Sequence, residues 1–521
     1  MKRNSIKILK DNFVYFLSLG LLSVLVLLGI LIPEPFQKFT GLLCDKITTN
    51  FGWFYLLLVT GILIFCIFLI VSPIGQITLG DPNSKPDHDT KSWIAMMFSA
   101  GMGIGLVFYG AAEPLSHFAV LTPNAPAGSQ EALADAFRFT FFHWGIHAWA
   151  VYALIGLALA YFGFRKQENY LLSVTLKPLL GKYENKSVAN IIDTITIVAT
   201  VIGVATTLGF GAAQINGGLN YLFGIPNNIF VQTIIIIITT GLFMMSALSG
   251  IGKGVKILSN INLILAIGLL AITIVIGPSV RIFDNLTESI GTYLQNFFRM
   301  SFRSAAFDGT KREWINSWTI FYWAWWISWS PFVGVFIARI SRGRTIREFL
   351  TVVLLIPTLL SFLWFSSFGT LSTSLQNSGV DLTKFATEEV LFATFSHYKG
   401  GMLLSLIAII LVTTFFITSA DSATYVLAML SEDGNLLPSN RKKLIWGILL
   451  AVIAVALLFS GGLMALQNTL IIVALPFSFV TILIMASLLK ELNHEKTEMG
   501  LKITPERLPE KDHPFKSYEE E

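Results

Sequence analysis

Two short stretches of the sequence concentrate aromatic side chains within long apolar segments. The stretch "YWAWWISWS" (322–330) contains four tryptophans, and "HWGIHAWAVY" (143–152) contains two tryptophans and a tyrosine. The face of an aromatic ring attracts a cation by about 0.5–2 kcal/mol. A quaternary ammonium group has no N–H, so hydrogen bonds cannot hold it, and aromatic rings are the side chains that suit it. The two stretches therefore predict a cage of rings for such a group.

The spacing of the aromatic residues favours the cage over a second interpretation. Trp318, Tyr322, Trp325 and Trp329 recur at positions i, i+4, i+7 and i+11, so they lie on one face of a helix. An aromatic belt at the membrane surface would occupy the helix ends. This cluster runs through the middle of its apolar segment, so a belt explains only part of it.

A third stretch, "SAGMGIGLVFYGAAEP" (99–114), is typical of a broken membrane helix. Gly101, Gly103 and Gly105 alternate within five positions, and each glycine costs about 1 kcal/mol in a helix interior. Transporters use such breaks at mid-membrane, where free N–H groups bind anionic substrate groups and free carbonyls bind Na⁺. Close packing of helices through small residues is the alternative. Glu113, at the far end of the stretch, could be structural or part of a gate.

The stretch "TTFFITSADSATY" (413–425) is the second candidate for binding an ion. Thr418 and Ser419 offer hydroxyl oxygens, and Asp421 is an ionisable residue at or near membrane depth. Hydroxyl and carbonyl oxygens suit a hard cation such as Na⁺. Hydrogen bonding between helices would explain the same residues, and both readings stay open on this stretch alone.

The composition predicts the fold that must position these residues. Of 521 residues, 54% are hydrophobic and 13% are charged, whereas soluble domains carry about 25% charged residues. We therefore predict an all-α integral membrane protein. Spanning helices need about 20 apolar residues, and twelve segments qualify: 13–33, 53–75, 93–118, 138–163, 190–214, 228–249, 257–278, 314–338, 350–370, 401–428, 443–460 and 466–489.

Basic residues predict the orientation of these segments, because Lys and Arg favour cytoplasmic loops. With the N-terminus inside, the strong clusters all fall on the cytoplasmic side, and both termini are cytoplasmic. The weak pair Lys311 and Arg312 is the exception. The clusters are Lys2 to Lys10, Arg165 and Lys166, Lys253 and Lys256, Arg339 to Arg347, and Arg441 to Lys443.

Segments outside the spans complete the expected organisation. A cytoplasmic tail (1–12) precedes a transporter domain (13–490), and a charged cytoplasmic tail (491–521) follows it, which could contact anionic lipid. Within the domain, residues of about 281–300 predict an amphipathic helix on the outer membrane face, with a plain loop as the alternative.

Several chemistries find no support in the sequence. It contains no signature of nucleotide-driven transport, of a zinc site or of a dithiol pair. We interpret His143 and His147 as packing or hydrogen-bonding residues rather than metal ligands. No constellation of nucleophile, base or metal ligands predicts an enzyme, and we expect neither a cofactor nor a nucleic-acid partner.

Taken together, the motifs "GMGIGLVFYGAAEP", "HWGIHAWAVY", "YWAWWISWSPFVGVFIARISRGRT" and "FFITSADSATY" resemble those of the betaine/choline/carnitine transporter family. The resemblance covers all twelve predicted spans. It implies that spans 3–12 form the two inverted five-helix repeats of the LeuT-type fold. It also implies a homotrimer, held in part by the amphipathic helix.

The resemblance also implies roles for individual residues. The family's substrate box corresponds to Trp144, Trp149, Tyr152 and Trp326, and its substrate path to Trp325 and Trp329. One sodium site corresponds to Ser99, Met102, Phe415, Thr418 and Ser419. A second corresponds to Thr200 and Phe332, but Val204 stands where the family has another threonine, although Thr206 and Thr207 lie close by in the sequence.

These correspondences lead to an expected function. Sodium-independent members lose the glycine motif, which this sequence keeps, and proton-coupled choline members tend to carry Asp where Gly105 stands. We expect Na⁺-coupled symport of glycine betaine across the plasma membrane, in osmoprotection, with Na⁺ as the coupling ion. The alternatives are a carrier of choline, carnitine or another betaine, coupled to protons or working by exchange, and a ligand-gated channel.

Overall fold

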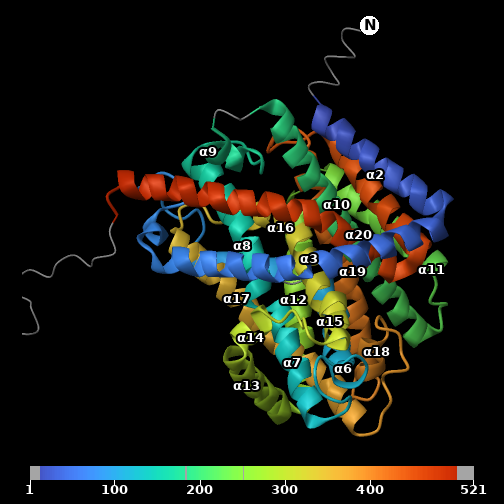
Figure 1. The fold of residues 1–521 in the computed structure, drawn as a ribbon. Coiled ribbons are helices and arrows are strands. Elements are labelled where there is room, and N and C mark those ends of the chain that lie inside the picture. Colours follow the sequence, from blue (N-terminus) through green and yellow to red (C-terminus); the bar gives the residue numbers. More distant parts are fainter. Residues whose placement is uncertain (1–11, 102, 182–184, 250–251, 502–521) are drawn as a thin grey trace, which may run out of the picture.

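The chain folds into a bundle of helices. A computed structural model describes residues 12–101, 103–181, 185–249 and 252–501, and every regular element in these ranges is a helix (Figure 1). A single isolated bridge joins Thr78 and Thr345. The prediction of an all-α membrane protein is confirmed.

The elements follow one another from α2 to α20. The long helices are α2 (Phe13–Leu31), α3 (Pro33–Val71), α7 (Gln130–Trp144), α8 (Ile146–Ala160), α10 (Lys186–Phe223), α11 (Ile229–Ser249), α12 (Gly252–Ile276), α13 (Ser279–Gln295), α16 (Phe321–Arg339), α17 (Ile346–Asn377), α19 (Gly401–Leu430) and α20 (Asn440–Glu498). The shorter ones are η1 (Pro73–Gln76), α4 (Thr90–Gly101), α5 (Ile104–Tyr109), α6 (Ala112–Ala119), η2 (Tyr161–Arg165), η3 (Val174–Leu176), α9 (Lys177–Leu180), α14 (Phe297–Ser301), α15 (Gly309–Ile315), η5 (Asn316–Ile320) and α18 (Val390–Phe395).

Ten described helical segments are long and apolar enough to cross a membrane. The predicted third span is not among them, because it is divided into α4, α5 and α6. The predicted eleventh and twelfth spans both lie within α20, where Gly461 and Gly462 interrupt the helical backbone. A total of twelve crossings stays a prediction. The ten segments would become twelve if the broken third span also crosses the membrane and α20 crosses it twice.

One boundary differs clearly from the sequence-based expectation. The second span was predicted to begin at residue 53, but α3 begins at Pro33 and continues for 39 residues. Proline is well suited to the first turn of a helix, since its fixed φ fits and its missing N–H is not needed there. The polar residues before position 53 therefore extend the helix instead of forming a loop.

In the described part of the chain, basic residues of three clusters (Arg165 and Lys166, Arg339 to Arg347, and Arg441 to Lys443) lie at one end of the bundle. There, Arg165 donates to the Gly80 carbonyl at 2.8 Å, Arg344 donates to the His88 carbonyl at 2.7 Å, and Lys442 donates to Asn12 at 3.0 Å. Glu495 forms an ion pair with Arg165 at 2.5 Å. Helix α20 therefore packs against this end of the bundle past residue 490, where the transporter domain was predicted to end. The common location agrees with a single cytoplasmic face, which stays a prediction.

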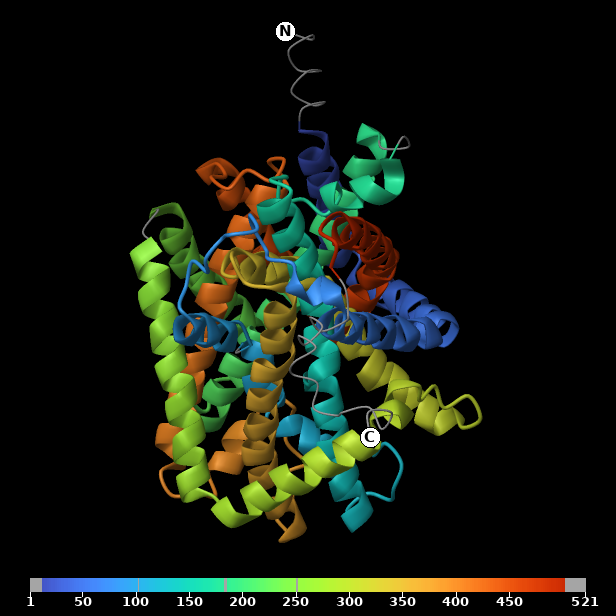
Figure 2. The same ribbon diagram turned by 90° about the vertical axis from the view of Figure 1, so that its left-hand side faces the viewer.

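The predicted amphipathic helix is present as α13. It covers Ser279–Gln295, with Ile282 and Tyr293 buried against the bundle and Val280 and Leu294 exposed. Figure 2 shows α13 running obliquely across the end of the bundle opposite to the N-terminus. The helix is confirmed, and its position at the outer membrane face stays a prediction.

Candidate functional site

The predicted break in the third span is confirmed. Helix α4 ends at Gly101, Gly103 is fully extended (φ −164°, ψ 179°), and α5 begins at Ile104. Of the residues predicted here, Met102 lies outside the described residues, as does the side chain of Ser99. The break exposes main-chain groups inside the bundle, which is what a mid-membrane binding site requires.

A second break, in the fourth span, was not predicted. Gly145 separates α7 from α8 with a non-helical backbone (φ −91°, ψ −147°). A Cβ at this position would lie 2.4 Å from the Phe141 carbonyl oxygen, so the close approach requires glycine. The single glycine in "HWGIH" was the available signal. It places Trp144 at the end of one helix and Trp149 in the first turn of the next.

The two breaks and helix α16 line a cavity of about 40 Å³. Eight of the nine predicted substrate residues line it: Gly103, Gly105, Trp144, Trp149, Tyr152, Trp325, Trp326 and Trp329. The surroundings of Gly101 lie outside what the structure describes. Among the residues that sequence reasoning missed, Thr207 of α10 and Ser361 of α17 add hydroxyl groups to the wall. Neither stands out in the sequence, because small polar residues are scattered through most of these spans.

Trp144, Trp149, Tyr152 and Trp326, here called the aromatic box, lie in contact with one another. The ring centres of Trp144 and Trp326 are 5.0 Å apart, those of Trp149 and Tyr152 5.3 Å, and those of Tyr152 and Trp326 6.0 Å. All three pairs meet edge to face. Trp325 stacks on Trp326 at 5.1 Å. The arrangement presents several rings to one enclosed space, as binding of a quaternary ammonium group requires.

Hydrogen bonds fix three of the indole rings. Trp325 donates to the Thr207 hydroxyl at 3.1 Å, Trp326 donates to the His143 carbonyl at 2.9 Å, and Trp144 donates to Glu113 Oε2 at 2.8 Å. The indole N–H of Trp329 is buried and has no hydrogen-bond partner in the part of the chain that the structure describes. Trp329 therefore has a free donor at the wall of the cavity.

Gly105 allows two of these rings to approach the main chain. A Cβ at this position would lie 2.9 Å from Trp144 and 2.9 Å from Trp325, closer than real Cβ contacts. In this conformation, any side chain at residue 105 would displace both rings. An aspartate at this position would therefore need a different arrangement of the cage.

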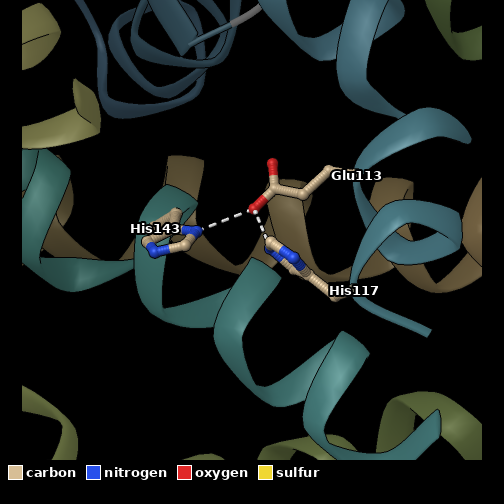
Figure 3. Close-up of side chains that lie close together, drawn as sticks. All are labelled: Glu113, His117 and His143. Carbon is tan, nitrogen blue, oxygen red and sulfur yellow. Dashed lines mark hydrogen bonds and ion pairs between the residues drawn. The ribbon is translucent and has the colours of Figure 1, made fainter. Parts of the chain in front are cut away.

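The Glu113 carboxylate binds four side chains beside the aromatic box. His143 Nδ1 lies 2.8 Å and His117 Nε2 3.4 Å from Glu113 Oε1, while Trp144 and Tyr322 both donate to Oε2. Figure 3 shows the two imidazoles converging on the carboxylate. The four donors come from α6, α7 and α16, and all these side chains lie inside the bundle.

This arrangement assigns Glu113 a positioning role. Its carboxylate holds Trp144 of the aromatic box directly, and it holds Tyr322, which stacks on Trp326 at 5.7 Å. Glu113, His117 and His143 are also of metal-ligand type, with ligand atoms within 4.8 Å of one another. The nitrogens that face the carboxylate already donate to it, which agrees with the interpretation of His143 as a hydrogen-bonding residue.

A second cavity brings together part of the first predicted sodium site. Phe415, Thr418 and Ser419 of α19 line it, and Trp329 lines both this cavity and the first. Three of the five predicted residues therefore lie together beside the substrate cavity. Thr418 donates to the Thr414 carbonyl at 3.0 Å and accepts from Asn262 of α12 at 3.0 Å.

The structure does not bring the two residues of the second predicted sodium site into one cavity. Thr200 is buried, donates to the Thr196 carbonyl at 2.7 Å, and lines neither cavity, whereas Phe332 lines the second one. Thr206 donates to the Leu466 carbonyl at 3.4 Å, and Thr207 accepts from Trp325. The hydroxyls of Thr206 and Thr207 therefore have hydrogen-bond partners other than Thr200.

A third cavity continues from the second toward the basic end of the bundle. The two cavities share Phe332, Phe336 and Ser422. Arg339 and Lys443 line the third cavity, together with Asp421, which accepts from Ser246 at 2.6 Å. The three cavities thus follow one another from the aromatic box to the end where the basic clusters gather.

Comparison with known proteins identifies the family. The model of the BCCT family, the betaine/carnitine/choline family transporters, matches residues 13–497. The chain is 55% identical over 487 residues to a glycine betaine transporter of Bacillus subtilis (strain 168), covering 93% of this chain and 95% of that protein. It is 41% identical to an ectoine/hydroxyectoine transporter of Virgibacillus pantothenticus, covering 93% and 97% of the two chains.

A third relative adds another substrate. The chain is 38% identical to an osmo-dependent choline transporter of Acinetobacter baylyi, covering 93% of this chain and 72% of that protein. Members of the matched family are transporters rather than enzymes. The fold, the aromatic cavity and these matches agree, and the chain belongs to the betaine/carnitine/choline transporter family.

Proposed function

We propose that this protein is a sodium-coupled symporter of glycine betaine that works by alternating access. The observation that carries the proposal is the single cavity in which aromatic rings from the fourth and eighth spans meet the broken third span. The similarity to a glycine betaine transporter supports the same substrate.

Glycine betaine carries a quaternary ammonium group and a carboxylate, and the cavity offers a partner for each. The rings of the aromatic box suit the ammonium group. The extended main chain at Gly103 and the free indole N–H of Trp329 offer donors for the carboxylate. The described lining residues include no ionised side chain. A zwitterion suits such a cavity, because it carries its own counter-charge.

Sodium coupling is proposed from the position of Phe415, Thr418 and Ser419. They lie beside the substrate cavity, with Trp329 between the two. A cation held there would stabilise the arrangement of helices that also forms the substrate site, so each ligand would favour binding of the other. Each sodium ion moving inward gains about 2.3 kcal/mol per 100 mV of membrane potential, which would drive accumulation of the solute.

Further expectations concern the membrane and the assembly. We place both termini and the third cavity at the cytoplasmic face, because Arg339 and Lys443 lie there with the other basic clusters. The Glu113 network would then close the outer side. We also propose that α13 contributes to contacts between subunits of a homotrimer, and that the charged C-terminal segment contacts anionic lipid.

Replacing Trp326 with leucine is expected to raise the KM for glycine betaine by about 2- to 30-fold, because one ring contributes about 0.5–2 kcal/mol to binding of the cation. The matched control is Trp53→Leu, since Trp53 is 55% exposed on α3 and lies outside the cavity. Uptake of labelled glycine betaine into proteoliposomes would measure both. An unchanged KM in Trp326→Leu would contradict the assignment of the aromatic box.

Competition in the same assay tests the substrate. Unlabelled glycine betaine is expected to inhibit uptake more strongly than choline or ectoine. Stronger inhibition by choline would indicate a cationic substrate, and would make the absence of a carboxylate at Gly105 the first point to revise.

A further inference from the structure

Asn262 lies beside the proposed sodium site but belongs to a helix that the family resemblance does not assign to it. It is on α12, is only 3% exposed, and donates from Nδ2 to the Thr418 hydroxyl at 3.0 Å. Its amide oxygen, Oδ1, is buried and has no hydrogen-bond partner among the described residues. A buried amide oxygen without a partner is unfavourable, so its presence beside a candidate ion site calls for an explanation.

The hydrogen bonds of Thr418 restrict what can satisfy this oxygen. The Thr418 hydroxyl directs its own hydrogen to the main-chain carbonyls of Thr414 at 3.0 Å and Phe415 at 3.3 Å. Its lone pairs therefore remain for outside partners, and the Asn262 N–H occupies one of them. If the Asn262 side-chain amide rotates by half a turn, its oxygen faces the Thr418 hydroxyl oxygen with no hydrogen between them. A cation placed between the two oxygens can then bind both.

We propose that Asn262 is a ligand of the coupling cation. With the site loaded, Asn262 Oδ1 and the Thr418 hydroxyl bind Na⁺ together. With the site empty, the amide turns over and its N–H donates to Thr418, as in this structure. This inference rests on the proposed sodium coupling, and amide oxygens are ligands that hard cations accept.

The assignment brings α12 into the cation site. The predicted ligands come from the third and tenth spans, whereas Asn262 comes from the seventh. Asn262 also lines the second cavity, next to Trp329 and Phe332. Binding of the cation would therefore hold α12 against α19 at the wall of this cavity, and release would remove that link.

Binding of radioactive sodium to the purified full-length protein tests the proposal without relying on transport. Asn262→Ala is expected to raise the Kd for sodium by about tenfold or more, since it removes one ligand of a buried ion. The matched control is Asn260→Ala, because Asn260 lines the same cavity but is exposed. Its Kd for sodium is expected to stay within about twofold of the original.

Asn262→Asp provides a second, conservative variant. It keeps an oxygen at the same place and adds a negative charge, so the Kd for sodium is expected to equal or fall below that of the original protein. Tryptophan fluorescence on addition of glycine betaine would show that each variant still folds and binds substrate. If Asn262→Ala does not fold, a weaker binding of sodium by Asn262→Asp would overturn the proposal.

The outcomes separate this inference from the proposed function. If the original protein binds no sodium and its uptake ignores sodium, the proposed coupling fails and this inference fails with it. If the original protein binds sodium and Asn262→Ala binds it equally well, only the assignment of Asn262 is overturned. An equal loss of affinity in Asn260→Ala and Asn262→Ala would also overturn it, because the effect would then belong to the cavity in general.

Discussion

Replacing Gly105 with alanine is expected to reduce uptake of glycine betaine by about tenfold or more. The added Cβ would lie 2.9 Å from both Trp144 and Trp325, which the hydrogen bonds to Glu113 and Thr207 hold in place. Overpacking of this kind costs about 1–3 kcal/mol. Here, the strain would fall on the rings that form the substrate cavity, so the initial rate of labelled uptake would measure it directly.

Gly241→Ala is the matched control for this prediction. Gly241 is exposed on α11, does not line the substrate cavity, and a Cβ there meets no described atom within 4 Å. Gly241→Ala should therefore retain uptake within about threefold of the original protein. Equal losses in the two variants would mean that adding a methyl group to a membrane helix, and not the space beside the rings, explains the effect.

Replacing Glu113 with alanine is expected to lower both stability and substrate binding. It would leave four buried donors without an acceptor: those of His117, His143, Trp144 and Tyr322. Each buried group without a partner costs about 1–3 kcal/mol. The melting temperature should fall clearly, and the KM for glycine betaine should rise by about tenfold or more, because Trp144 and Tyr322 lose their fixed positions.

Two further variants separate positioning from general stability. Glu113→Gln should be milder, since its amide oxygen can still accept from Trp144 and Tyr322 while each facing imidazole changes its tautomer to accept from the amide N–H. Asp193→Asn removes a buried carboxylate that binds Ser173 at 2.7 Å, about 21 Å along α10 from Thr207. It should lower stability and leave the KM unchanged. An unchanged KM in Glu113→Ala would contradict the positioning role.

Local signals in the sequence predicted a large part of this molecule. Ring chemistry and the clustering of aromatic residues pointed to the two stretches that contain Trp144, Trp149 and Trp325, and the alternating glycines identified the break before Ile104. These features depend on residues close together in the chain. Predicting which of them share a cavity needed the family resemblance as well, because the fourth and eighth spans are far apart in the sequence.

The features that the sequence did not reveal depend on distant contacts. Tyr322 donates to Glu113 across 209 positions, and Asn262 donates to Thr418 across 156. Neither the spacing of residues nor the composition of the chain indicates that such distant residues are in contact. The division of the fourth span at Gly145 is a different case, because the atom closest to a Cβ there, the Phe141 carbonyl oxygen, lies only four residues earlier in the chain.

The central claim is that a sodium gradient drives uptake of glycine betaine, and one measurement tests it most directly. Purified protein in proteoliposomes would take up labelled glycine betaine with an inward sodium gradient, and then with potassium replacing sodium at the same membrane potential. We predict accumulation above the external concentration with sodium, and no accumulation with potassium. Equal accumulation with both ions, or flux that only equalises the concentrations, would contradict the claim.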